Sequence, residues 1–269
     1  MENIGVSLNW LSTTTHDFPT LSQHDLHLWW LPLTLTDEQA EHALRLLSDI
    51  QRDKYHRRMT PLLKQAYLAG RYYLLTLLGL YNRCPAHKVE LSYSRLNKPS
   101  LSHQGSHLEF NFTDTQHNNE HFGLFGFTRA GVIGVDIESR HRNIDLTQLI
   151  AKRFTPAERD YVTQADGRIN KARGLSIWTR KEAYGKATGQ GINFKMNQQN
   201  LTNQQHSKHC SDAAFNFRDS QTHQWRCLSL NLGQHFVASC VHSGNQALTI
   251  SAFNSLKHGT PVSMMFEDK

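Results

Sequence analysis

The amino-acid sequence predicts an α+β fold. Strand-like and helix-like segments occur in both halves of the chain, without the strict strand–helix alternation that is typical of a parallel sheet. The chain has 269 residues, of which 38% are hydrophobic and 19% charged, so it can bury a sizeable core and lacks the composition of a disordered protein. Length alone allows one large domain or two smaller ones.

The first third of the chain predicts one strand and two helices. Residues 27–33 (HLWWLPL) form a short apolar run that is typical of a strand. Thr36 begins a capping box, which predicts the start of a helix. Pro61 predicts the start of a longer helix that continues to about Leu80. Gly70 inside this helix costs about 1 kcal/mol relative to alanine, which indicates a close packing contact at that position.

The middle of the chain predicts strands, and helices follow them. Alternating polarity predicts strands over residues 90–93, 107–112, 122–127 and 131–138, the last two on either side of a turn. Helices are predicted over residues 146–153, 156–163 and 170–188, the second starting from a capping box and the third ended by a glycine. Three antiparallel strands are predicted over residues 213–217, 225–232 and 235–241, and residues 246–269 form a tail without assignment.

The charge balance favours an anionic ligand or an acidic partner, without choosing between them. There are 29 Lys and Arg residues against 23 Asp and Glu, a net charge of +6. The four cysteines form no C-x-x-C pair, which favours reduced thiols in the cytoplasm. No apolar stretch approaches the ~20 residues of a membrane span, and the N-terminus carries no secretory signal. We therefore expect a cytoplasmic protein without a membrane partner.

Two acidic residues mark the strand predicted over 131–138. On a strand, Val135 and Ile137 can enter the core while Asp136 and Glu138 project together from the other face. Two carboxylates held this close repel each other unless a cation lies between them, and hard oxygen ligands of this kind suit Mg²⁺. The alternative is a solvated strand face that ends in a turn.

Charged residues also stand together on the helix predicted over 170–188. Glu182 and Lys186 are i, i+4 neighbours on one face, and Lys181 is adjacent in sequence. One interpretation is a metal-binding carboxylate next to an ammonium group that holds a pyrophosphate. The other is an exposed ion pair worth about 0.3–0.5 kcal/mol. Polar residues at 110–115, a basic turn at Lys98 and a basic cluster over 52–58 are further candidates for anion binding, although each is also typical of an ordinary surface.

The order and spacing of these motifs resemble a known family. GVDIE at 134–138 is followed, about forty residues later, by WTRKEAYGKATGQG at 178–191. This pair resembles the two signatures of the 4′-phosphopantetheinyl transferase family, surfactin-type branch. The upstream Lys98-Pro99 and the segment 110–115 resemble its other two motifs, in the expected order, and RFTPAERDYV at 153–162 resembles the connecting helix.

The resemblance implies roles for individual residues. The metal-binding acids are matched by Asp136, Glu138 and Glu182, and Glu182 also matches the acid proposed as the base for the incoming serine. Lys186 matches a lysine that holds the pyrophosphate of coenzyme A, and Lys181 belongs to the same motif. Further contacts to coenzyme A are implied for Lys54, Lys98, Asn111 and Thr113, with Lys54 directed at the 3′-phosphate.

The resemblance also implies the architecture and the reaction. Two similar α+β subdomains, residues 1–130 and 131–245, would each pack a small antiparallel sheet on a long helix, related by a pseudo-twofold axis with the coenzyme A cleft between them. With Mg²⁺ as cofactor, the protein would transfer 4′-phosphopantetheine from coenzyme A to a serine hydroxyl of an apo acyl or peptidyl carrier protein and release 3′,5′-ADP. Carrier proteins are acidic, which suits a chain of charge +6. We expect a monomer.

One residue departs from the family pattern. The family commonly has a histidine after the Ser or Thr of its third motif, where this chain has Asp114. An aspartate beside a phosphate would repel it, so either Asp114 turns away or another base takes the 3′-phosphate. Lys98 and Arg95 are the candidates.

Two other functions are compatible with parts of the sequence. A non-catalytic coenzyme A or nucleotide-binding module would keep the fold, but it would not need a complete set of three acids. A nucleic-acid-binding protein would show a basic stripe with interleaved aromatic residues, and the chain has none, so we expect no nucleic-acid partner.

Overall fold

The structure is a computed structural model, and it describes residues 8–14, 17–102, 107–191, 195–203 and 213–257. The helices are α1 (Asp37–Leu46), α2 (Asp49–His56), α3 (Pro61–Asn82), α4 (Leu146–Arg153), α5 (Pro156–Val162) and α6 (Lys171–Thr188), with short 3₁₀ turns at Ala86–Lys88 and Met196–Gln198. The strands are β1 (Trp10–Thr14), β2 (Asp25–Pro32), β3 (Leu91–Tyr93), β4 (Pro99–Leu101), β5 (Glu109–His117), β6 (Glu120–Thr128), β7 (Ile133–Ser139), β8 (Ala214–Arg218), β9 (Gln224–Leu230), β10 (Phe236–Ser243) and β11 (Thr249–Lys257).

The helices begin where local chemistry predicts. Thr36 and Thr155 close complete capping boxes at α1 and α5, and Pro61 occupies the first turn of α3. A Cβ at Gly70 would lie 2.8 Å from the ring of Phe112, which confirms the close packing contact predicted there. In the described part of the chain, no helix combines the length and the apolar character that a membrane span needs.

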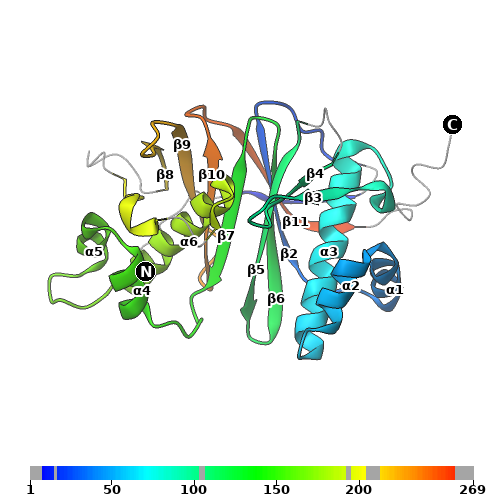
Figure 1. Ribbon diagram of the computed structural model, residues 1–269, viewed down its shortest axis with the longest axis horizontal. Coiled ribbons are helices and arrows are strands. Elements are labelled where there is room, and N and C mark those ends of the chain that lie inside the picture. The colour runs from blue at the N-terminus through cyan, green and yellow to red at the C-terminus, as the bar shows by residue number, and fades with distance from the viewer. Residues whose placement is uncertain (1–7, 15–16, 103–106, 192–194, 204–212, 258–269) are drawn as a thin grey trace.

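Two sheets form the centre of the molecule, and the α+β prediction is confirmed. The first sheet has the order β1-β11-β2-β6-β5 and the second has the order β7-β10-β9-β8. Apolar side chains of β2 and β6 pack between the sheets against those of β7, β9 and β10. Helix α3 covers the outer face of the first sheet, and α6 covers that of the second. The layers therefore run helix, sheet, sheet, helix, as Figure 1 shows with α1–α3 and α4–α6 on opposite sides of the strands.

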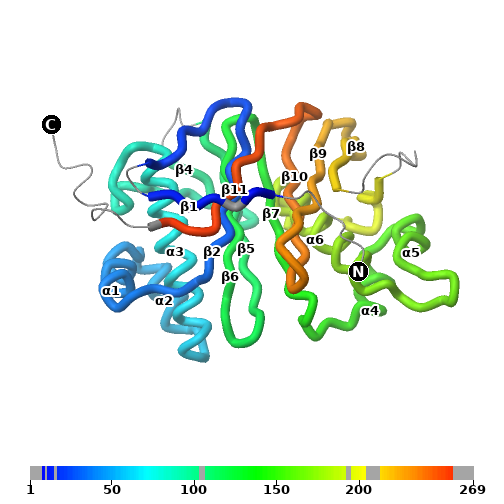
Figure 2. Tube along the Cα trace, turned by 180° about the vertical axis from the view of Figure 1, so that it is seen from behind, coloured from blue at the N-terminus to red at the C-terminus, as the bar shows by residue number. Residues whose placement is uncertain are grey.

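The last described strand differs from expectation. Residues 249–257, which the sequence left in an unassigned tail, form β11 between β1 and β2 (Figure 2), while residues 258–269 of that tail lie outside the described residues. Strand β11 pairs parallel with both neighbours, so the first sheet is mixed rather than purely antiparallel. A second difference concerns the predicted turn after residue 127: it leads from β6 in the first sheet to β7 in the second and does not close a hairpin.

Strand β7 lies where the two halves meet. It pairs with β10 on one side only, and β5 of the first sheet packs against its other edge. Side chains from β5 satisfy that free edge: the Oδ1 of Asn111 accepts the N–H of Val135 at 3.0 Å, and the Oγ1 of Thr115 accepts that of Ser139 at 3.2 Å. All seven residues of β7 are consequently buried.

Candidate active site

The acidic pair of β7 is buried, so its interpretation as a solvated strand face is wrong. Asp136 and Glu138 are each 5% exposed, and Val135 and Ile137 point the other way, into the core between the sheets. Gly134 shares the face of the acids. A Cβ there would lie 2.0 Å from the carbonyl oxygen of Ala183, so only glycine lets the backbone of α6 approach β7 this closely. This approach brings the Glu182–Lys186 turn of α6 over the two acids.

Lys186, Asp136 and Thr113 meet in one cluster. The Nζ of Lys186 lies 2.6 Å from the Oδ1 of Asp136 and 2.8 Å from the Oγ1 of Thr113, and that hydroxyl lies 3.2 Å from the same carboxylate oxygen. The three side chains come from α6, β7 and β5, so the cluster joins the two halves of the chain. Lys186 is 26% exposed, which leaves its ammonium group accessible to a ligand.

Glu138 is held in place by two donors. The indole Nε1 of Trp178 donates to its Oε1 at 3.2 Å, and the guanidinium of Arg142 forms an ion pair with the same oxygen. Neither donor was assigned a role from sequence. Trp178 precedes Glu182 by four residues on α6, so helical spacing places both on one face and could have indicated its position. Arg142 lies beyond the end of β7, where nothing in the sequence indicates which way it points.

Each of the three acids keeps one buried carboxylate oxygen that has no hydrogen-bond partner among the described residues. These atoms are Asp136 Oδ2, Glu138 Oε2 and Glu182 Oε1. Leaving a buried acceptor unpaired costs about 1–3 kcal/mol. Burial, opposed by Lys186 and reinforced by Glu138, raises the pKa of Asp136 to about 7 and also raises that of Glu182. Unpaired carboxylate oxygens gathered in one place favour a bound cation.

The donor set fits a hard divalent cation. Mg²⁺ takes carboxylate oxygens from one or two acids and completes its shell with waters and phosphate oxygens. Asp136, Glu138 and Glu182 each have one unpaired oxygen of this chemical kind. In the described residues, no three acidic, histidine or cysteine side chains are arranged so that they could hold a metal ion as they stand. The ammonium of Lys186 and the guanidinium of Arg142 instead balance Asp136 and Glu138.

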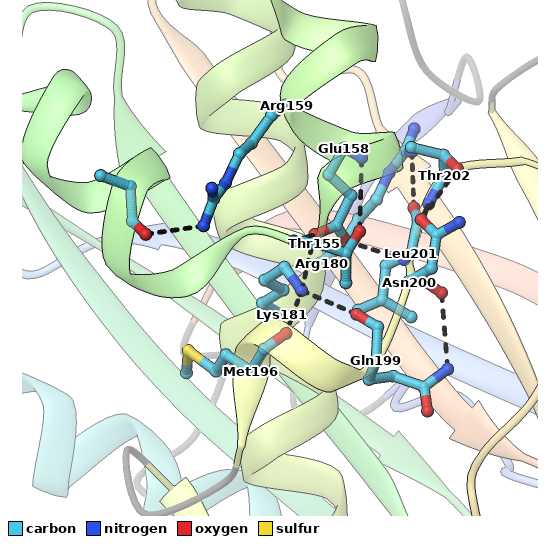
Figure 3. A network of polar contacts seen from close by, with 11 residues as sticks. Thr155, Glu158, Arg159, Arg180, Lys181, Met196, Gln199, Asn200, Leu201 and Thr202 are labelled. Carbon is cyan, nitrogen blue, oxygen red and sulfur yellow. Dashed lines mark hydrogen bonds and ion pairs between the residues drawn. The ribbon is translucent and has the colours of Figure 1, made fainter.

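Lys181 does not join this cluster, contrary to the role in coenzyme A binding that the sequence implied. Its ammonium group is fully buried and lies 2.8 Å from the Oε2 of Glu158 in α5 (Figure 3). It also donates to the carbonyl oxygens of Gln199, at 2.7 Å, and Met196. Successive residues of a helix point about 100° apart, so Lys181 is directed at α5 while Glu182 reaches the acids of β7.

The remaining implied ligands lie around the site at different depths. Asn111 is 5% exposed and its side chain is engaged by the backbone of β7, as described above. Lys98 is half-buried, and its Nζ donates to the carbonyl oxygen of Ala187 at 2.7 Å, at the end of α6. Lys54 is exposed on α2, with its Nζ 5.9 Å from the ring centroid of Tyr93. Tyr93 pairs with Pro99 in the β3–β4 hairpin, next to Lys98.

Comparisons with known proteins identify the family of this chain. The family model described as the 4′-phosphopantetheinyl transferase superfamily matches residues 132–241, which run from the start of β7 through α6 to β10. The chain is 31% identical over 175 residues to the 4′-phosphopantetheinyl transferase HetI of Nostoc sp., covering 64% of this chain and 72% of that protein. It is 25% identical over 226 residues to a phosphopantetheinyl transferase of Thraustochytrium sp., covering 77% of this chain and 76% of the other. The chain therefore belongs to the 4′-phosphopantetheinyl transferase superfamily, enzymes that use coenzyme A as substrate and transfer its phosphopantetheine group to carrier proteins.

Proposed function

We propose that this chain performs a Mg²⁺-dependent transfer of 4′-phosphopantetheine, with its chemistry at the cluster formed by β5, β7 and α6. The observation that carries the proposal is the set of three unpaired, buried carboxylate oxygens beside one accessible ammonium group. Buried carboxylates with unpaired oxygens favour a cation, and a cation held next to a lysine suits a pyrophosphate.

Three acids would hold the metal: Asp136, Glu138 and Glu182. Bound there, Mg²⁺ would neutralise negative charge on the pyrophosphate. Trp178 and Arg142 keep the Oε1 of Glu138 engaged, which leaves its Oε2 for the metal. Lys186 would bind a pyrophosphate oxygen, because its ammonium lies beside Asp136 and Thr113 and its side chain is 26% exposed, and the hydroxyl of Thr113 would donate beside it.

The reaction is a displacement at phosphorus. The serine oxygen of the carrier protein forms a bond to the phosphorus that bears pantetheine, and the P–O bond to the 5′-phosphate of 3′,5′-ADP breaks. Glu182 would accept the serine proton. Burial and the neighbouring Glu138 raise its pKa, and a base with a raised pKa takes up a proton more readily near neutral pH. Lys186 would stabilise the charge that develops on the leaving phosphate.

The partners follow from the same arrangement. Residues from both halves of one chain complete the cluster, so we propose that the protein acts as a monomer. An acidic apo acyl or peptidyl carrier protein suits the net charge of +6. Cys84, Cys227 and Cys240 are free thiols, which supports a reducing, cytoplasmic location. Lys98 and Lys54 border the β3–β4 hairpin and are proposed contacts to the nucleotide part of coenzyme A.

The direct test is the intact mass of purified apo carrier proteins after incubation with the enzyme, coenzyme A and Mg²⁺. We expect a gain of one phosphopantetheine group, and none in excess chelator. Full modification in chelator would contradict the metal requirement while leaving the transfer reaction in place. No gain with any apo carrier under both conditions would contradict the function itself.

A further inference from the structure

Three histidines meet at one end of β7. His117 is the last residue of β5, His141 follows β7 by two residues, and His235 directly precedes β10. Their ring centroids lie 4.9 Å apart for His117 and His235, and 5.1 Å apart for His117 and His141. The third distance, between His141 and His235, is 5.6 Å. Three imidazoles from three separate segments therefore form one group, which we call the imidazole cluster.

Hydrogen bonds hold the imidazole cluster in place, while two of its rings stay open to solvent. The Oγ of Ser139 accepts the backbone N–H of His141 at 3.2 Å and lies 3.1 Å from the Nδ1 of His117. His117 is half-buried, whereas His141 and His235 are exposed. Exposed imidazoles exchange protons with water near neutral pH, so a change in their protonation can accompany a binding event.

The charged groups around the imidazole cluster favour an acidic ligand. Two of its members line a cavity of about 560 Å³, and Arg142 lines the same cavity. Arg140 donates its backbone N–H to the carbonyl oxygen of His235 at 2.8 Å. Among the described residues of the cavity lining there is one acid, Asp114, and its Oδ2 lies 3.2 Å from the Nδ1 of His121. Positive charge therefore outweighs negative charge on this surface.

The three rings oppose one another's protonation. A proton on one imidazole places a positive charge beside the next ring, which disfavours a second proton. Partial burial, and after it the charges of His235 and His141, lower the pKa of His117, while Glu120 at the start of β6 opposes them. The imidazole cluster therefore resists full protonation, and carboxylates placed against it would reverse this by favouring the charged form.

The imidazole cluster lies next to the proposed reaction site. Ser139, which binds two of its members, directly follows Glu138 on β7. Glu138 belongs to the acidic cluster, which it forms with Asp136 and Glu182. Arg142 connects the two places, because it lines the cavity and also forms the ion pair with Glu138. A partner that reaches the acidic cluster from this end of β7 therefore meets the imidazole cluster as well.

Resting on the proposed function, we infer that the imidazole cluster is a proton-linked contact for the acidic carrier protein. The serine that reacts at the acidic cluster belongs to a folded carrier, and the carrier surface beside that serine would lie over this end of β7. Its carboxylates would draw protons onto the imidazole cluster. Binding of the carrier therefore takes up protons and strengthens as the pH falls from 8 to 6, whereas binding of coenzyme A does not depend on this cluster.

The test measures the binding of an apo acyl carrier protein whose acceptor serine is replaced by alanine, so that no turnover occurs. Calorimetry in chelator, in two buffers of different ionisation enthalpy, gives the number of protons taken up. Wild type should take up about one proton, which lowers the dissociation constant by up to about tenfold for each unit by which the pH falls. His141→Gln combined with His235→Gln should take up less than about half as many protons and flatten this pH dependence.

A matched control removes two other histidines. His24→Gln combined with His87→Gln changes two exposed side chains outside the cavity, so it should keep the proton uptake and the pH dependence of wild type. A transfer assay at pH 6.5 adds a second readout. The variant of His141 and His235 should raise the KM for the carrier and leave the KM for coenzyme A unchanged.

Three outcomes would overturn the inference: equal proton uptake by wild type and the variant of His141 and His235, no binding of any apo carrier, or equal uptake when poly-glutamate replaces the carrier. The last result would assign the imidazole cluster to polyanions in general. Failure of the proposed function is separate. A wild-type protein that binds the carrier with proton uptake but adds no phosphopantetheine to its serine form would contradict the function and leave the contact in place.

Discussion

Two lysines of α6, five residues apart, form ion pairs of nearly equal length. The two pairs differ in their burial and in how completely their carboxylate oxygens are hydrogen-bonded. Lys181 lies 2.8 Å from Glu158, and Lys186 lies 2.6 Å from Asp136. Around Glu158 every oxygen is engaged: Oε1 accepts the N–H of Leu201 at 2.8 Å, and Oε2 accepts that of Thr155 at 2.7 Å as well as Lys181. Around Asp136, Oδ2 accepts no hydrogen bond from the described residues, and the Lys186 side chain is 26% exposed.

The difference separates a structural pair from a pair poised to bind a ligand. Lys181 and Glu158 are both 0% exposed. Their ion pair joins α6 to α5, and Lys181 also binds the carbonyl oxygens of Met196 and Gln199. These contacts hold the helix that carries Glu182 and Lys186 in position on the side away from the acidic cluster. Asp136, Glu138 and Glu182 each keep one buried oxygen without a hydrogen-bond partner among the described residues. An ion pair with every donor and acceptor engaged stabilises the fold, whereas one with unpaired oxygens keeps capacity for a cation.

The largest effect is expected from breaking the complete pair. Lys181→Met should lower the free energy of unfolding by about 3–5 kcal/mol, because it leaves Glu158 buried without its counter-charge. Urea denaturation measures this loss. The double variant Lys181→Met with Glu158→Leu should recover much of the stability, since it removes the uncompensated charge. A single variant as stable as wild type would show that the pair is not structural.

Breaking the incomplete cluster should affect catalysis instead. Glu182→Gln should lower the transfer rate at least about 100-fold, equivalent to roughly 2.7 kcal/mol of barrier, because a proposed metal ligand and base is lost. Its melting temperature should not fall, since one of three mutually repelling carboxylates is neutralised. Asp37→Asn, at the exposed start of α1, is the matched control and should keep the wild-type rate. A Glu182 variant with wild-type turnover would contradict the assignment.

The pH dependence of the free energy of unfolding should reveal the raised pKa of Asp136. Burial raises the pKa of Asp136 from 3.8 to about 7, so between these values the folded state keeps a proton that the unfolded state has released. The free energy of unfolding should therefore fall as the pH rises through this range, by up to about 1.4 kcal/mol per unit from this group. Measured in chelator, the difference between wild type and Asp136→Asn should widen in favour of the variant from pH 4 to pH 7. A constant difference would be inconsistent with a raised pKa.

The smallest effect is expected where a short ion pair is exposed. Arg168 and Asp166 lie 2.6 Å apart, as close as Lys186 and Asp136, but their side chains are 81% and 47% exposed. Arg168→Ala should leave the free energy of unfolding essentially unchanged, because water screens the pair. Urea denaturation of wild type and Arg168→Ala measures this change, because urea is uncharged and does not itself screen the ion pair. A loss comparable to that of Lys181→Met would show that distance, and not burial, sets the value of these pairs.

Sequence patterns were sufficient for several features whose physics is local, although the capping box of Ser48 and Gln51 that begins α2 was not recognised. The capping boxes at Thr36 and Thr155 depend on residues three apart, and the helix starts were correct. Asp136 and Glu138 share a strand face for the same reason. Their meeting with Glu182 and Lys186 could be expected only through the resemblance to a family, because no local rule brings residues about forty positions apart together.

Several features depend on contacts between residues far apart in the sequence, and sequence patterns could not predict them. Adjacent residues Lys181 and Glu182 belong to one motif, yet only the position of α5 shows that the first is structural. The partner of Asp114 is His121, which lies on the neighbouring strand and gives no sign of that pairing in the sequence. Strand β11 was unassigned because its apolar pattern is short, and its place between β1 and β2 depends on strands more than 200 residues earlier in the chain.

The place of β11 has a consequence for the order of folding. Strands β1 and β2 are joined only through β11, which the ribosome delivers after the whole of the second sheet. The first sheet therefore stays open along one edge of β2 until the second half has been synthesised. Pairing across so large a sequence separation is slow. The two halves consequently complete their folding together, late, and an amino-terminal fragment that ends before residue 249 would expose an unpaired, apolar strand to aggregation.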